Sequence, residues 1–133
     1  MQNLVCVACL FLVGLLGCVS TQIPNSLDYV RDPNCKVNEG VKRNAIPKTP
    51  HNMSLPNFGQ GVIGWATGPE GADARLNNIQ KADLKEIQDK GTTLKMVKEW
   101  QVFYENEVKR NPCNPTALYR ADLMKKIARL WAD

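Results

Sequence analysis

The sequence is poor in the residues that most often carry chemistry. It has one histidine, His51, and five cysteines in 133 residues, and aromatic side chains make up 7% of the chain. It contains no phosphate-binding glycine loop, no Cys/His spacing typical of a zinc site and no internal repeat. These absences exclude the common enzyme and metal-site motifs, and we expect no metal and no cofactor.

Basic residues are missing from the start of the chain. The first Lys or Arg is Arg31, and residues 4–19 are uncharged and mostly apolar. This run is shorter than the membrane span of about 20 residues that charged flanks would anchor, and it ends in small residues, as the core of a secretory signal does. We therefore predict a signal peptide over residues 1–20 and no membrane span after its removal.

Two routes of processing fit this signal. Leu15-Leu16-Gly17-Cys18 is similar to a bacterial lipobox, which would make Cys18 the acylated first residue of an envelope lipoprotein tethered to the membrane. Leu16 stands where a small residue is usual, and the start Met1-Gln2-Asn3 has no basic side chain, although bacterial export signals normally begin with one. Plain cleavage and secretion is the favoured interpretation, and the lipoprotein is the alternative.

Removal of the signal peptide leaves two cysteines, Cys35 and Cys113. An even pair in an exported chain is most simply a disulfide. Cys113 lies between Asn111-Pro112 and Asn114-Pro115, a stretch that cannot be a regular helix, so a bridge from there can reach the N-terminal part of the chain without disturbing one. The sequence therefore predicts a Cys35–Cys113 disulfide.

The pattern changes near Gly59. Residues 21–58 are rich in proline and have no sustained hydrophobic period, which predicts an irregular N-terminal arm, whereas residues 59–133 form the predicted helical domain. The stretch GQGVIGWATGPEG opens that domain. Its glycines bracket Val62, Ile63 and Trp65, which we interpret as a tight turn that leads into a short, buried, strand-like plug.

Helix signals dominate from Pro69 onward. Pro69 is expected near a helix start, with Glu70 in the first turn or in a capping box with Thr67. A second, short helix is expected near residues 82–90, because Gly91 is a good residue to end it.

Two longer helices are expected to follow. Thr92 or Thr93 caps the first, whose apolar side chains recur at spacings of three and four: Val97, Trp100, Tyr104 and Val108. Asn114 and Pro115 begin the second. No helix of this kind can bury its apolar face alone, so the sequence predicts a mainly α fold, a small bundle of three to four helices over about residues 69–131.

Two residues are weak candidates for catalysis. His51 lies between turn-forming residues in the arm, and nothing in the pattern predicts a carboxylate that would orient it. Glu99 stands beside Trp100, a pattern that can raise the pKa of an acid, but Lys95 and Lys98 indicate a solvated helix face. The sequence thus favours a role other than catalysis, with a small exported hydrolase that uses His51 or a carboxylate as the alternative.

The remaining signals concern modification and partners. Asn52-Met53-Ser54 is a candidate N-glycosylation acceptor in the arm. The net charge of +4 is modest, and export makes a nucleic-acid partner unexpected. The leading hypothesis is a secreted, disulfide-tied helical binding or effector module that acts on an extracellular protein or an anionic surface.

Overall fold

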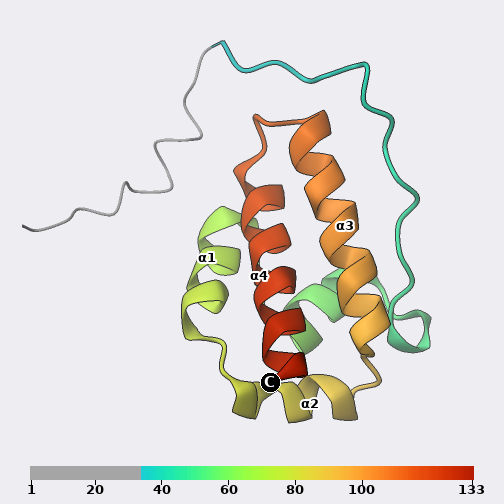
Figure 1. The fold of residues 1–133 in the computed structure, drawn as a ribbon, viewed down its shortest axis with the longest axis vertical. Helices are drawn as coiled ribbons and strands as arrows, with labels where there is room; N and C mark the ends of the chain where they lie inside the picture. Colours follow the sequence, from blue (N-terminus) through green and yellow to red (C-terminus); the bar gives the residue numbers. More distant parts are fainter. Residues whose placement is uncertain (1–33) are drawn as a thin grey trace, which may run out of the picture.

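The computed structural model describes residues 34–133, which form a mainly helical domain preceded by an irregular arm (Figure 1). No strand occurs in this range. The predicted fold class is confirmed. The predicted signal peptide over residues 1–20, Cys18 and the first part of the arm lie outside the described residues. The helical elements, in chain order, are η2 (Pro50–Asn52), η3 (Asn57–Ile63), α1 (Gly68–Asn78), η4 (Lys81–Asp83), α2 (Leu84–Asp89), α3 (Leu94–Arg110) and α4 (Pro115–Ala132).

Helices α3 and α4 are the centre of the bundle. They lie side by side and make the most extensive contact between any two elements of the described chain (Figure 1). Helix α1 packs on α4, and the short α2 lies across the end of the bundle where the chain terminates. The arm runs along the outer side of α3, so α3 is covered by α4 on one side and by the arm on another.

The predicted caps of the two long helices are present. The side chain of Thr93 accepts a hydrogen bond from Met96 N at the start of α3, at 3.2 Å. Asn114 Oδ1 accepts one from Thr116 N at the start of α4, where Pro115 occupies the first position. Such caps stabilise a helix by about 1 kcal/mol each, because they satisfy backbone N–H groups that have no partner within the helix.

Of the two arrangements expected at the start of α1, the capping box is absent. Glu70 lies in the first turn, as expected, but Thr67 makes no capping hydrogen bond. The hydroxyl of Thr67 instead accepts a hydrogen bond from Gln60 Nε2 at 3.3 Å, which ties η3 to the start of α1.

The glycine-rich stretch does not form the predicted strand-like plug. Residues Asn57–Ile63 form a π-helical turn, η3, although Val62, Ile63 and Trp65 are buried as expected. The carbonyl oxygen of Gly59 accepts hydrogen bonds from Gly64 N (2.7 Å) and Trp65 N (3.0 Å), so the chain folds back on itself. A buried segment needs hydrogen-bond partners for its backbone N–H and C=O groups, and these local bonds supply them where the described chain has no neighbouring strand.

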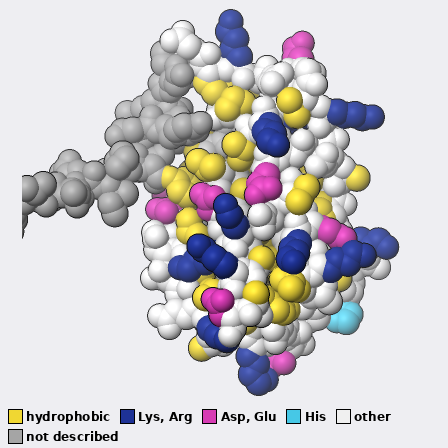
Figure 2. Space-filling model, in the orientation of Figure 1, with side chains coloured by type: hydrophobic (Ala, Val, Ile, Leu, Met, Phe, Trp, Pro, Cys, Tyr) yellow, Lys and Arg dark blue, Asp and Glu magenta, His cyan; other side chains and the backbone are white. Residues whose placement is uncertain are grey.

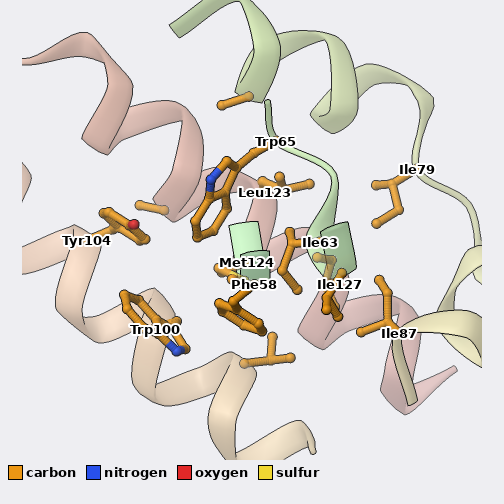
Figure 3. Close-up of a cluster of buried hydrophobic side chains, with 14 of the residues drawn as sticks. Phe58, Ile63, Trp65, Ile79, Ile87, Trp100, Tyr104, Leu123, Met124 and Ile127 are labelled. Carbon is orange, nitrogen blue, oxygen red and sulfur yellow. The ribbon is translucent and has the colours of Figure 1, made fainter. Parts of the chain in front are cut away.

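The core is built around aromatic side chains from η3, α3 and the segment between η3 and α1 (Figure 3). Phe58 packs on Trp65 and Trp100, with ring centroids 6.0 and 5.6 Å apart. Tyr104 closes the cluster, because it contacts both tryptophans. Burying each of these side chains stabilises the fold by roughly 1.5–3 kcal/mol.

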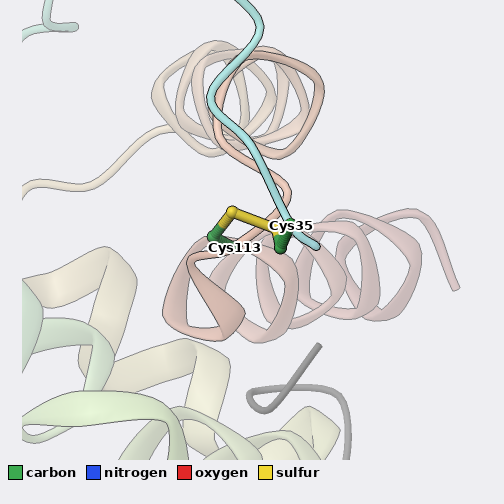
Figure 4. Close-up of a disulfide and its surroundings, with 2 residues drawn as sticks. All are labelled: Cys35 and Cys113. Atoms are coloured by element: carbon green, nitrogen blue, oxygen red, sulfur yellow. A yellow bond between two sulfur atoms is a disulfide. The ribbon is translucent and has the colours of Figure 1, made fainter. Parts of the chain in front are cut away.

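The predicted disulfide between Cys35 and Cys113 is present (Figure 4). Cys113 lies in the turn between α3 and α4, and the bridge joins it to the start of the described arm. The two residues are 78 positions apart, and closing a loop of that length stabilises the folded state by about 4–5 kcal/mol in the chain-entropy model. The bridge therefore supplies a large part of the stability expected for a domain of this size.

The packing of η3 can be tested at two of its glycines. A Cβ atom on Gly59 would lie 2.0 Å from Trp65 Nε1, whereas a Cβ on Gly61 would meet nothing within 4 Å. Gly59→Ala should therefore lower the free energy of unfolding by about 1–3 kcal/mol, because the Trp65 ring must move. Gly61→Ala is the matched control and should change it by less than about 0.5 kcal/mol. Denaturant titration measures both, and equal effects would contradict the described packing.

Candidate functional site

The arm is fixed along α3 by hydrogen bonds spread over its length. Three of them join the two segments: Asn38 N to Arg110 O (2.7 Å), Asn106 Nδ2 to Lys42 O (3.0 Å) and Trp100 Nε1 to Lys48 O (3.0 Å). Their order shows that the arm runs antiparallel to α3. Because the arm is held at three points between Asn38 and Lys48, its residues take part in a defined surface.

An ion cluster adds to this attachment. Glu107 of α3 is buried, and its carboxylate accepts hydrogen bonds from Arg110 Nε (3.0 Å) and Nη2 (2.9 Å). Arg43 of the arm lies 3.3 Å from the same carboxylate. The Arg110 hydrogen bonds, aided by the charge of Arg43, hold the pKa of Glu107 below its ordinary value despite burial. Glu107 is thus ionised at neutral pH and binds the arm to the C-terminal half of α3.

A groove of about 480 Å³ opens between the arm and α3, and we call it the arm groove. Its arm side consists of residues 44–48, and its helix side includes Thr93, Met96 and Phe103. A second hollow, of about 450 Å³, shares Lys95, Glu99 and Val102 with the groove and extends it toward Leu94 and Lys98.

The arm groove combines exposed apolar side chains with charge. Ile46 and Val102 stand on opposite sides of it and are 63% and 55% exposed, respectively, although both are large and apolar. Lysines predominate among the charged side chains of the groove and its extension: Lys48, Lys95 and Lys98 against Glu99. Around the face shown in Figure 2, basic and acidic side chains are interspersed and form no single basic patch.

The structure places His51 and Asn52 away from the arm groove, at the far end of the arm. Both are exposed and have positive φ angles, 52° and 54°. His51 Nε2 lies 2.8 Å from the position that a Cβ of Gly91 would occupy, so the His51 side chain rests on the turn before α3. No described carboxylate forms an ion pair with His51, and the groove does not bring it to Glu99.

Glu99 does line the arm groove. Its Oε1 lies 3.8 Å from Lys95 Nζ, and its side chain is 44% exposed, so it occupies the solvated helix face that its neighbours predicted. Within residues 34–133, no group of three or more His, Cys, Asp and Glu side chains is arranged to hold a metal ion. In the same range, no helix is both long and apolar enough to cross a membrane.

Apart from Glu99, sequence reasoning did not single out the residues that form the arm groove. One signal could have indicated it: Val102 falls outside the buried stripe of α3 and on the same helical face as Lys95 and Glu99. A large apolar residue on a charged face needs a covering element or a partner. The position of Ile46 opposite it could not be inferred, because the arm has no regular period.

Comparisons with known proteins give a family and a structural relative. A family model described as "Domain of unknown function (DUF4951)" matches residues 33–131, a range that contains both bridged cysteines. The chain is also similar to a protein from Acinetobacter baumannii with a solved NMR structure, at 58% sequence identity and a TM-score of 0.63. That alignment covers 72% of this chain and 90% of the other. No curated protein matches significantly.

The ion cluster makes stability depend on pH in a defined direction. The pKa of Glu107 is lower in the folded state than in the unfolded state. The stabilisation that ionised Glu107 gives to the folded state is therefore fully present above the unfolded-state pKa of about 4.3, and it is lost as pH falls through the folded-state pKa. Glu107→Gln should lower the free energy of unfolding at pH 7 by about 1–2 kcal/mol. In this variant the free energy of unfolding should also decrease less steeply as the pH falls below about 4.5, because the titrating carboxylate is gone.

Glu99→Gln serves as the control for this measurement. Its only described ion pair, with Lys95, is exposed, and such pairs contribute at most about 1 kcal/mol. Denaturant titrations of both variants between neutral and acidic pH provide the comparison. An equal loss in the two variants would contradict the role assigned to the Glu107 cluster.

Proposed function

This chain belongs to the family described as "Domain of unknown function (DUF4951)", and we propose that it is a small exported binding module that holds a segment of a partner polypeptide in the arm groove. The observation that carries the proposal is the pair Ile46 and Val102, two large apolar side chains that remain exposed across one groove. Leaving them in water is unfavourable, and burying them against a partner would remove that cost.

Export is supported by the chain's own chemistry. The uncharged run over residues 4–19 is typical of a signal peptide, and the Cys35–Cys113 bridge is compatible with an oxidising compartment such as the periplasm or the exterior. The similarity to a protein from a bacterium favours a bacterial export route, so we do not propose a glycan at Asn52. Acylation at Cys18 would tether the same module to a membrane.

The charges around the arm groove indicate the chemistry of the partner. Lys48, Lys95 and Lys98 outnumber Glu99, so the groove favours an acidic segment. Its volume of about 480 Å³ lies within the range of ordinary ligand sites. The partner segment should therefore carry an apolar residue that sits between Ile46 and Val102, with Asp or Glu next to it. We propose binding rather than hydrolysis because the structure brings no second catalytic group to His51 or Glu99 within the described residues.

Selection from a library of random displayed peptides tests this partner chemistry. The oxidised protein should enrich sequences in which an apolar residue is flanked by Asp or Glu, and their binding should weaken as salt rises. Enrichment of basic sequences, or of none above background, would contradict the proposal.

Val102→Glu should abolish binding of the selected peptides, because it replaces an apolar contact with a charge that repels acidic side chains. The matched control is Val37→Glu, which makes the same change at another exposed valine, 49% exposed and outside the groove. Both variants should keep the thermal midpoint of the unmodified protein within a few degrees. Loss of binding in both, or in neither, would show that the groove is not the site.

Intact mass of the protein made by its native export route tests localisation and processing together. We expect a chain that begins near Thr21 or Gln22 and whose mass rises on reduction by the hydrogens of one disulfide. A chain that begins at an acylated Cys18 would instead show that the protein is a lipoprotein tethered to a membrane. A full-length chain retained in the cytoplasm would contradict export.

A further inference from the structure

A separate cavity of about 150 Å³ lies where the arm, α3 and the first turn of α4 meet. Leu55, Phe103 and Ala117 give it apolar walls, and Tyr104, Thr116 and Arg120 supply polar atoms. A single water molecule needs only about 10–15 Å³ of such space, so the cavity can hold a small organic molecule. It is more enclosed than the arm groove, with which it shares Ile46 and Phe103.

Arg120 has no acidic partner among the described residues. Its guanidinium lies over the Trp65 ring, 4.6 Å from the centroid, and near the Tyr104 ring at 5.6 Å. One nitrogen, Nη1, donates to the Tyr104 hydroxyl at 3.3 Å, whereas Nε is buried and has no hydrogen-bond partner. A half-buried guanidinium without an anion is costly, so this side chain is suited to receive one.

The hydroxyl of Tyr104 offers a second donor. Burial is the main cause that raises the pKa of Tyr104, so the hydroxyl keeps its proton at neutral pH. It accepts a hydrogen bond from Arg120, and no described residue accepts its own hydrogen. Thr116 also lines the cavity, in the first turn of α4, where the helix dipole favours a negative charge.

Glu107 also lines the cavity, and its negative charge must be weighed against these donors. Arg110 and Arg43 both contact its carboxylate, at 2.9 and 3.3 Å, so that charge is already compensated. With Arg120 included, the three arginines outweigh the one glutamate. The side chains around the cavity therefore carry an excess positive charge, which Arg120 supplies.

We propose that this cavity binds a carboxylate with a small apolar body, in which Arg120 and Tyr104 donate to the carboxylate and Leu55, Phe103 and Ala117 contact the apolar part. A planar guanidinium can make paired hydrogen bonds to the two carboxylate oxygens, which an amide or an alcohol cannot match. The carboxylate belongs to a free organic acid or to the C-terminal end of a polypeptide. The inference does not rest on the arm groove, because neither Arg120 nor Tyr104 lines it.

Titration of the isotope-labelled, oxidised protein with benzoate, followed by NMR, tests the inference. Shifts should concentrate at Tyr104, Thr116, Ala117 and the Arg120 side chain, and benzamide at equal concentration should bind at least about tenfold more weakly. Benzamide has the same shape without the charge, so equal binding of the two would overturn the proposal. This comparison uses the unmodified protein and does not depend on the stability of any variant.

Substitutions of Arg120 then test whether this side chain donates to the carboxylate. Arg120→Gln should weaken benzoate binding about tenfold or more, and Arg120→Lys, which keeps the charge without the planar fork, should weaken it less. Arg129→Gln is the matched control, because Arg129 is an exposed arginine on the same helix and does not line the cavity. It should bind as the unmodified protein does. A folded Arg120→Gln variant with unchanged affinity would overturn the proposal.

A pair of short apolar peptides separates the two sources of the carboxylate. If a peptide with a free C-terminal carboxylate binds more tightly than benzoate, and its C-terminally amidated form loses that binding, the source is the end of a polypeptide. If the peptide acid binds more weakly than benzoate, the source is a free organic acid. Equal binding of the peptide acid and its amide, together with equal binding of benzoate and benzamide, would overturn carboxylate recognition altogether.

Discussion

The disulfide between Cys35 and Cys113 is the constraint on which the surface of this protein depends. The helices can pack through their own apolar faces, but between Asn34 and Met53 the arm has only the single turn η2 and little buried area of its own. The bridge fixes the start of the described arm beside the turn between α3 and α4, and the chain then runs back along α3. Both the arm groove and the cavity lined by Arg120 and Tyr104 have the arm as one wall, so both depend on that attachment.

Helix α3 connects the core to this surface through single side chains. Trp100 packs its ring against Phe58 and Tyr104, and the same indole donates from Nε1 to Lys48 O in the arm. Tyr104 contacts both tryptophans in the core and presents its hydroxyl to Arg120. A binding surface supported by buried aromatic residues is held in one geometry, and this lowers the entropy that a ligand must otherwise lose on binding.

Local signals in the sequence predicted the helices, the caps of α3 and α4, and the bridge. The helices and caps depend on residues that are close together in the sequence, and the bridge on the even number of cysteines left after the signal peptide. Asn114 and Pro115 show this directly, and at α3 the sequence narrowed the cap to Thr92 or Thr93, of which Thr93 forms it. The π-helical turn was missed because Gly59 is required by a contact with Trp65 that no periodic pattern expresses. The candidate sites were missed for a related reason. Arg120 meets Tyr104 and Trp65, and Ile46 faces Val102, only after distant segments have been brought together.

Backbone relaxation of residues 36–49, measured by NMR before and after reduction of the bridge, tests the central claim most directly. In the oxidised protein, the arm should be nearly as ordered as α3, with order parameters near about 0.85. Reduction should lower them first between Cys35 and Arg43, while α3 and α4 stay ordered and the hydrogen bond from Trp100 still holds Lys48. Order parameters below about 0.6 along the arm of the oxidised protein would contradict the account, because a mobile arm cannot form a wall of either site.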